Sequence, residues 1–269
     1  MFATGADVEI RHAVEFSHVT YRTPDGRALL ADLNFSVAAG ETLVLLGRSG
    51  SGKTTALKLI NRLLAQHAGQ VLVQGKSTAE WDLIRLRRSI GYAIQEVGLF
   101  PHMTVERNVG LVPQLEHWPA EKIKARIEEL LEHVGLPAQQ YGARYPNQLS
   151  GGQRQRVGLA RALAADPPIL LMDEPFGALD PLTRTDIQKE FKSLQQRLNK
   201  TVVFVTHDVQ EAMLLASRIA VLEAGKLLGI FSPREFLLSK APFVQNYTDV
   251  LRSALQIVLA GEHGEEKRR

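Results

Sequence analysis

The stretch of sequence that decides the fold is Gly47-Arg48-Ser49-Gly50-Ser51-Gly52-Lys53-Thr54. It fits the pattern G-x-x-x-x-G-K-S/T, and it stands between the apolar run Thr42–Leu46, predicted to be a strand, and a predicted helix over Thr54–Leu64. Glycines in such a turn let successive backbone N–H groups converge on phosphate oxygens, and the helix N-terminus adds positive potential. The sequence therefore predicts a phosphate-binding loop.

The residue types in this loop suit the phosphates of a nucleotide and its Mg²⁺ ion. Lys53 is expected to reach the β- and γ-phosphates, and the Thr54 hydroxyl is expected to ligate Mg²⁺. A Gly-rich turn that binds nothing is the alternative, and the flanking strand and helix disfavour it. The predicted phosphate-binding residues are Gly47, Arg48, Ser49, Gly50, Ser51, Gly52, Lys53, Thr54 and Thr55.

Short apolar runs rich in Val, Ile and Leu continue along the chain, and each is followed by a turn or by a helix signal. Continuous apolar strands that alternate with helices indicate a buried, mostly parallel central sheet with crossover helices. The predicted elements are the strands Ile169–Met172 and Val202–Val205, the helices Pro181–Leu198 and Val209–Ala216, and the hairpin strands Ile219–Leu222 and Lys226–Ile230.

Two segments depart from this alternation. Val14–Tyr21 and Ala28–Val37 are separated by a Pro-Asp-Gly turn, which predicts two strands of an N-terminal antiparallel β subdomain. Residues 99–166 show helical spacing without a strand pattern, and they predict a helical subdomain inserted into the sheet domain. We therefore expect an α/β fold with one domain over residues 1–240, followed by a C-terminal helix and charged tail over residues 241–269.

Two adjacent carboxylates follow the predicted strand Ile169–Met172. In ATPases with a phosphate loop, an acid at this place holds Mg²⁺, and a second acid can polarise the water that attacks the γ-phosphate. Acids that merely solvate the end of a strand are the alternative. Because the phosphate loop lies upstream, we predict that Asp173 binds the metal and that Glu174 is the general base.

A second Gly-rich helix start lies at Leu149-Ser150-Gly151-Gly152-Gln153. Ser150 and Gln153 form the pattern of a capping box, which explains the start of a helix but not its two glycines. Each glycine costs up to about 1 kcal/mol against Ala inside a helix. Backbone N–H groups at such a start favour an anion, so the chain carries two predicted phosphate-binding helix starts.

Three further features follow this pattern: Gln95 after a strand-like run, Ala178-Leu179-Asp180, and His207 after a predicted strand. Together these motifs resemble the phosphate loop, Q-loop, signature, acidic strand, D-loop and switch histidine of the ATP-binding subunit of ABC transporters. The resemblance covers about residues 14–235. It implies the fold of a P-loop NTPase-type ABC ATPase domain, with ATP and Mg²⁺ bound.

The resemblance also implies roles for individual residues. Gln95 would contact Mg²⁺ and the attacking water, and His207 would contact the γ-phosphate and orient the base. Tyr21 would stack on adenine. Two copies would form a head-to-tail dimer, in which the turn Ser150-Gly151-Gly152-Gln153 of one copy closes on the ATP of the other and Asp180 shapes the seam.

Composition agrees with a peripheral transport subunit. The 269 residues include 32 Lys and Arg against 29 Asp and Glu, with no long basic run of the kind that marks a nucleic-acid-binding arm. The chain has no cysteine and no apolar run long enough for a membrane-spanning helix. We expect it at the cytoplasmic face of the inner membrane, bound to permease subunits, with an extracytoplasmic solute-binding protein as an indirect partner and no nucleic acid.

The segments Gly91–Val105 and Leu111–Pro113 are similar to those of importers of glycine betaine, choline and carnitine. Many members of that branch carry a C-terminal regulatory domain, and the 39 residues after Ile230 are too few for one. Importers of polyamines, sulfonates or nitrate remain an alternative. A soluble ABC ATPase that acts on ribosomes or DNA is disfavoured, because the chain has a single phosphate loop and no long coiled coil.

Overall fold

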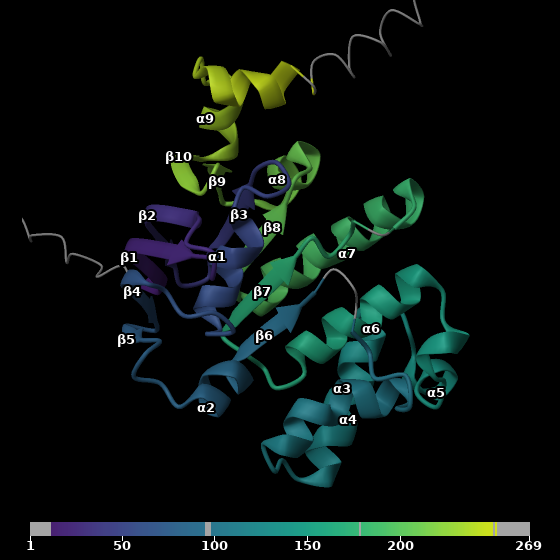
Figure 1. The fold of residues 1–269 in the computed structure, drawn as a ribbon. Coiled ribbons are helices and arrows are strands. Elements are labelled where there is room, and N and C mark those ends of the chain that lie inside the picture. Colours follow the sequence, from purple (N-terminus) through teal and green to yellow (C-terminus); the bar gives the residue numbers. More distant parts are fainter. Residues whose placement is uncertain (1–11, 95–97, 178, 250, 252–269) are drawn as a thin grey trace, which may run out of the picture.

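The computed structural model describes residues 12–94, 98–177, 179–249 and 251, and these residues form two β-sheets and a set of helices (Figure 1). The larger sheet has the strand order β10-β9-β3-β8-β7-β6. Its strands are parallel except β10, which pairs antiparallel with β9, so the predicted sheet and hairpin are confirmed. The strands are β3 Thr42–Leu46, β6 Ile90–Ala93, β7 Ile169–Asp173, β8 Thr201–Thr206, β9 Arg218–Glu223 and β10 Lys226–Phe231.

Three adjacent strands of this sheet, β3, β8 and β7, are buried along their whole length. Such burial on both faces explains why their sequences are almost continuously apolar rather than alternating. The register pairs Leu46 with Thr206 and Asp173 with Val205, so β3, β7 and β8 end at the same edge of the sheet. This edge carries the phosphate loop after β3, the two adjacent carboxylates at the end of β7, and His207 after β8.

The smaller sheet is antiparallel with the order β2-β1-β4-β5, which confirms the N-terminal β subdomain. The sequence predicted only the first two of its strands. Strand β4 escaped prediction because it begins with the exposed residues Ala68, Gly69 and Gln70, which give no apolar alternation. The strands are β1 His12–Arg22, β2 Ala28–Ala38, β4 Ala68–Val73 and β5 Lys76–Ser77.

The helices that pack on the larger sheet follow the predicted crossovers, with one correction. Helix α1 ends at Ile60 rather than at Leu64, because Arg62 adopts a left-handed backbone (φ +50°) and the Leu64 N–H donates to the Lys58 carbonyl at 3.0 Å. Helix α7 has the predicted bounds. The helices are α1 Lys53–Ile60, α2 Leu83–Arg88, α7 Pro181–Leu198, α8 Val209–Leu215 and α9 Pro233–Leu238.

The inserted segment is helical, as predicted, and Figure 1 shows it as a separate group of helices beside β6. The chain enters this subdomain after β6 and returns to the sheet at the start of β7. Helix α3 packs against α6 and α4. The elements are α3 Val105–Leu115, α4 Ala120–His133, α5 Ala138–Tyr141, a 3₁₀ turn at Pro146–Gln148 and α6 Gly151–Leu163.

Two apolar clusters lie on opposite faces of the larger sheet. One joins that sheet to α1 and to the smaller sheet, and the other joins it to α6, α7 and α8. Residues 242–249 are helical, and Val244 is buried in the second cluster. The predicted boundary at residue 240 stays a prediction. No helix among the described residues is long and apolar enough to span a membrane.

Candidate functional site

The phosphate loop joins β3 to α1, and its glycines set its shape. A Cβ at Gly47 would meet the carbonyl oxygen of Leu222, so no larger residue fits there without movement. Gly50 and Gly52 have φ angles of +79° and +101°, which glycine alone adopts without strain. Gly52 precedes α1 without any side-chain cap, so the first N–H groups of α1 are available to an anion.

Lys53 is enclosed by the loop, with only 4% of the residue exposed. Its ammonium group donates to the carbonyl oxygens of Gly47 at 2.8 Å and Arg48 at 3.0 Å. Burial lowers the pKa of Lys53, and the nearby Glu174 and Asp173 charges oppose that shift. A cation held in this way lies where the loop would place negatively charged phosphates.

Asp173, the last residue of β7, is hydrogen-bonded to Thr54 at the start of α1. The Thr54 hydroxyl donates to Asp173 Oδ1 at 2.8 Å, and the Tyr92 hydroxyl lies 3.5 Å from Oδ2. Burial raises the pKa of Asp173 above its ordinary value, although the Thr54 hydrogen bond opposes the change. Burial and the Asp173 charge also raise the pKa of Tyr92. A hydroxyl and a carboxylate oxygen side by side are hard donors of the kind that Mg²⁺ prefers beside nucleotide phosphates.

Glu174 leaves the strand through a left-handed backbone conformation with φ +45°. Its N–H donates to the Val205 carbonyl at 3.0 Å, and this contact with β8 holds the turn. For a residue other than glycine, the conformation costs roughly 1 kcal/mol, a strain that is common at functional sites. Glu174 Oε2 lies 3.1 Å from Nδ1 of His207, whose side chain is 61% exposed.

The second Gly-rich turn lies at the start of α6, and the predicted capping box is present. Ser150 Oγ accepts from the Gln153 N–H at 3.2 Å, and Gln153 Oε1 accepts from the Ser150 N–H at 2.9 Å. Gly151 is exposed, whereas Gly152 is buried against α7, where an added Cβ would lie 2.6 Å from Thr183 Cγ2. The packing of two helices therefore explains Gly152, and Gly151 has no such packing reason.

The remaining predicted residues have the following places. Asp180 caps α7, and its Oδ1 accepts from the Thr183 N–H at 3.0 Å. Tyr21 is half-buried in β1, and its ring meets the edge of His67 with 5.4 Å between ring centroids. Gln95 and Ala178 lie outside the described residues.

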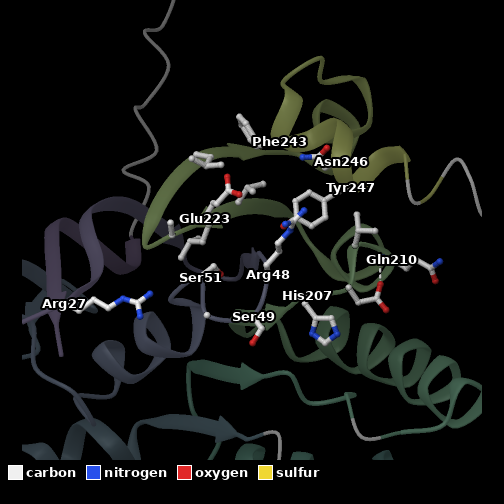
Figure 2. A pocket seen from close by; sticks show the side chains of 17 residues that line it. Arg27, Arg48, Ser49, Ser51, His207, Gln210, Glu223, Phe243, Asn246 and Tyr247 are labelled. Atoms are coloured by element: carbon white, nitrogen blue, oxygen red, sulfur yellow. Dashed lines mark hydrogen bonds between the residues drawn. The ribbon is translucent and has the colours of Figure 1, made fainter. Parts of the chain in front are cut away.

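A cavity of about 740 Å³ lies on the outer side of the phosphate loop. Figure 2 shows Arg48 pointing from the loop toward Tyr247 of the C-terminal helical segment, with Ser49 and His207 at the other end of the cavity. Burial raises the pKa of Tyr247, and the nearby Arg48 charge opposes that shift. Sequence reasoning missed this contact and that of Tyr92 with Asp173, because neither belongs to a local motif.

The structure thus brings the predicted phosphate loop together with the adjacent acids and His207. Lys53, Thr54, Asp173, Glu174 and His207 meet at one edge of the larger sheet. Among the described residues, no hydrogen bond joins the turn at residues 150–153 to the phosphate loop.

The comparison with known families agrees with this geometry, since residues 30–177 match the profile of the family described as ABC transporter. The chain belongs to the ABC transporter family. This ABC transporter chain is 51% identical over 223 residues to a glycine betaine/carnitine/choline transport ATP-binding protein of Bacillus subtilis, covering 82% of the chain and 58% of that relative. It is 49% identical to a choline transport ATP-binding protein of the same organism, with the same coverage. It therefore spans less than two thirds of the length of these curated relatives.

A solved structure extends the comparison of this ABC transporter chain to its fold. It is a dimeric structure of a post-hydrolysis state of an ATP-binding cassette bound to ADP and Pi. It is 35% identical, has a TM-score of 0.74, and matches 82% of this chain and 99% of its own length. The predicted fold class is thereby confirmed.

Proposed function

We propose that the chain binds and hydrolyses ATP as the ATP-binding subunit of an ABC importer. One observation supports this proposal above the others. The phosphate loop, the Thr54–Asp173 pair and the Glu174–His207 pair all lie at the carboxyl ends of three adjacent strands. This edge of an open α/β sheet is where ligands are expected.

In this proposal the loop residues Gly47 to Thr55 hold the phosphates. The backbone N–H groups at the start of α1 and the Lys53 ammonium bind the phosphate oxygens, while Lys53 gives up its bonds to the loop carbonyls. The Thr54 hydroxyl and Asp173 would hold Mg²⁺, and Gln95 would complete that set from outside the described residues. The metal ion would offset charge on the β- and γ-phosphates. Tyr21 would stack on the adenine.

Glu174 would act as the general base. Its carboxylate would accept a proton from the water that attacks the γ-phosphate, and the phosphoryl group would pass to that water as the bond to ADP breaks. His207 would contact the γ-phosphate and hold the Glu174 carboxylate in its direction through the 3.1 Å contact. The left-handed turn at Glu174 directs the carboxylate away from the strand and toward His207.

A second copy would complete each site. The turn at Ser150, Gly151, Gly152 and Gln153 is exposed at Ser150 and Gly151, and in the part of the chain that the structure describes no hydrogen bond joins it to the phosphate loop. In a head-to-tail pair, this turn would close on the γ-phosphate of the other copy, and Asp180 would lie at the seam. The dimeric form of the solved relative supports this arrangement.

The permease would dock between the helical subdomain and the sheet. A groove of about 380 Å³ lies there, and its lining combines apolar residues such as Ile94, Leu111 and Val112 with the arginines Arg87, Arg88 and Arg161. Phe100 lies at its rim with 40% of the residue exposed. The buried Asn108 side chain bonds to the Phe100 backbone at 2.8 and 3.1 Å, so this rim is held rigidly.

Similarity to glycine betaine, choline and carnitine relatives supports an osmoprotectant as the transported solute. An importer of another solute, such as a polyamine, sulfonate or nitrate, is the second candidate. In either case we place the chain at the cytoplasmic face of the membrane, with a solute-binding protein on the other side.

The variant Glu174→Gln tests the proposed function. It should lower ATP turnover by more than about 100-fold, because an amide cannot accept the proton, while ATP affinity is retained. ATP with Mg²⁺ should then convert the variant to a dimer measurable by light scattering. Turnover at the wild-type rate would show that Glu174 is not the base.

The same variant, tagged and recovered from native membranes with ATP and Mg²⁺, tests the importer assignment. A multi-spanning permease should accompany it, and this association should be lost in Phe100→Arg but kept in Leu63→Arg, an exposed apolar site outside the groove. The companion binding protein is then titrated with glycine betaine, choline and carnitine. Recovery of ribosomes, nucleic acid or no membrane protein would contradict the importer assignment and leave the ATPase proposal intact.

A further inference from the structure

A buried carboxylate lies directly behind the turn that carries His207. Glu211 is in α8, one turn beyond His207, and only 4% of the residue is exposed. Its two oxygens have different partners: Oε2 accepts from the Thr206 hydroxyl at 2.5 Å, and Oε1 accepts from the Gln188 side-chain amide at 3.0 Å. None of the proposed catalytic roles uses this group, and a buried carboxylate is costly to keep in a protein.

Thr206 connects Glu211 to the backbone on both sides of His207. Its hydroxyl donates to Glu211 and also accepts from the Asp208 N–H at 2.9 Å. These bonds link the residues immediately before and after His207. Asp208 in turn caps α8 through the Gln210 N–H at 2.7 Å. The His207 side chain itself is largely exposed, and its position therefore depends on this backbone turn rather than on packing of the ring.

Helix α7 holds the same turn from the other side. Gln188 of α7 bonds to Glu211, and Arg184 of α7 lies 3.8 Å from the Asp208 carboxylate. Thr183, near the start of α7, packs against Gly152 at the start of α6. A continuous set of contacts thus runs from the Ser150 turn through α7 to the His207 turn and on to Glu174.

We propose that Thr206 and Glu211 are positioning residues that hold His207 against Glu174 and tie the His207 turn to α7. The inference rests on the proposed ATPase function and names residues that this function alone does not require. The alternative is that Thr206 and Glu211 only satisfy each other's hydrogen-bonding groups in the core and contribute to stability alone. The two readings differ in what happens to catalysis when the fold is intact.

Thr206→Val in the full chain is the first test, because valine keeps the shape of threonine and removes the hydroxyl. We expect kcat for ATP to fall about tenfold, because His207 would lose one of the hydrogen bonds that hold its turn in place. KM for ATP should change less than about twofold. Thr206→Ser keeps the hydroxyl and should restore most of kcat. Melting curves and titration with a fluorescent ATP analogue confirm that both variants are folded and bind nucleotide.

The variant Glu211→Gln separates charge from geometry. Gln188 can turn its amide to present an oxygen to the new amide group, so both hydrogen bonds persist, and we expect kcat to stay within about threefold of wild type. Glu211→Ala removes the acceptors of both Thr206 and Gln188, and its kcat should fall at least as far as that of Thr206→Val.

The decisive measurement is a double-mutant cycle with His207→Ala. If Thr206 acts through His207, the double variant should lose no more kcat than His207→Ala alone. Additive losses, or a Thr206→Val variant with wild-type kcat, would overturn the inference and leave the ATPase proposal standing. A wild-type chain without ATPase activity in the presence of Mg²⁺ would overturn both.

Discussion

At the scale of single residues, the site contains a buried acid, Asp173, whose ionised form is disfavoured. Asp173 has a pKa above its ordinary value of 3.8, chiefly because burial disfavours the charged form. Because the folded state disfavours the ionised form of this carboxyl, its ionisation lowers the free energy of unfolding. This loss of stability develops as the pH rises above about 4. Asp180 has the opposite shift, because hydrogen bonds from Thr183 lower its pKa.

These shifts predict opposite effects of neutralisation at two acids. Without nucleotide or metal, Asp173→Asn should raise the melting temperature at pH 7 by a few degrees, because the amide keeps the Thr54 bond without a buried charge. The matched variant Asp180→Asn keeps its cap and should lower the melting temperature slightly.

The Asp173→Asn difference should shrink as the pH falls toward 4, because the raised pKa means that wild-type Asp173 becomes protonated in this range. The Asp180→Asn difference should persist down to pH 4, because the lowered pKa keeps wild-type Asp180 ionised there. The check is a set of melting curves between pH 4 and pH 8. A stabilising effect of Asp173→Asn that is independent of pH would show that its origin is packing rather than charge.

Residues of the site were predictable where they belong to a short motif. The phosphate loop and the adjacent acids were named from spacing alone, and the structure places Thr54 and Asp173 in contact. The partners Tyr92 and Glu211 were not predictable, because they reach the site through the sheet register and through helix packing rather than through local sequence.

At the scale of elements, the packing of α6 on α7 explains why the adjacent Gly151 and Gly152 differ in their tolerance of a side chain. An added Cβ at Gly152 would lie 2.6 Å from Thr183 Cγ2, whereas at Gly151 the nearest neighbour is the end of the Arg154 side chain at 4.0 Å. The contact between α6 and α7 therefore requires one glycine and tolerates replacement of the other.

We expect Gly152→Ala to destabilise the chain by about 1 to 3 kcal/mol, because α6 and α7 must move apart. Gly151→Ala, its control, should be neutral or stabilising by up to about 1 kcal/mol, since alanine is the better helix former. Urea unfolding of both variants measures the difference. Equal effects would mean that the helices accommodate a methyl group at this contact.

A fully buried strand and a partly exposed helix were both predictable from the sequence. The fully buried β3 has the predicted bounds, and α7 runs between its capping Asp180 and the left-handed Asn199, as the position of Pro181 indicated. The end of α1 was wrong by four residues because the apolar residues Leu63 and Leu64 follow the helix in a turn. Apolar content alone does not distinguish the two.

At the scale of the whole molecule, the C-terminal helical segment is packed on the main core. Val244 is fully buried, and the rings of Phe243 and Tyr247 lie 6.2 and 6.3 Å from Phe231 and Phe236. Removal of this segment would expose two of these rings to water.

Truncation after Lys240 tests whether residues 1–240 form an independent unit. We expect the melting temperature to fall by roughly 5 to 10 °C, from the loss of one buried valine and of aromatic contacts worth about 2 to 3 kcal/mol in all. Deletion of residues 252–269 alone is the control, because it leaves these contacts in place. An unchanged melting temperature after truncation at Lys240 would support the boundary at that residue.

The way in which the chain enters and leaves the helical subdomain restricts how that subdomain can move. It departs from the end of β6 and returns at the start of β7, two parallel neighbours paired from Ile90↔Ile169 to Ala93↔Met172. The two attachments are therefore separated along the strands by about 10 Å. An axis drawn through the two attachments runs mainly along the strands and is inclined to them, because neighbouring strands lie about 5 Å apart. Turning about that axis would swing Ser150 sideways through an arc, while Asp173, close to the axis, would hardly move.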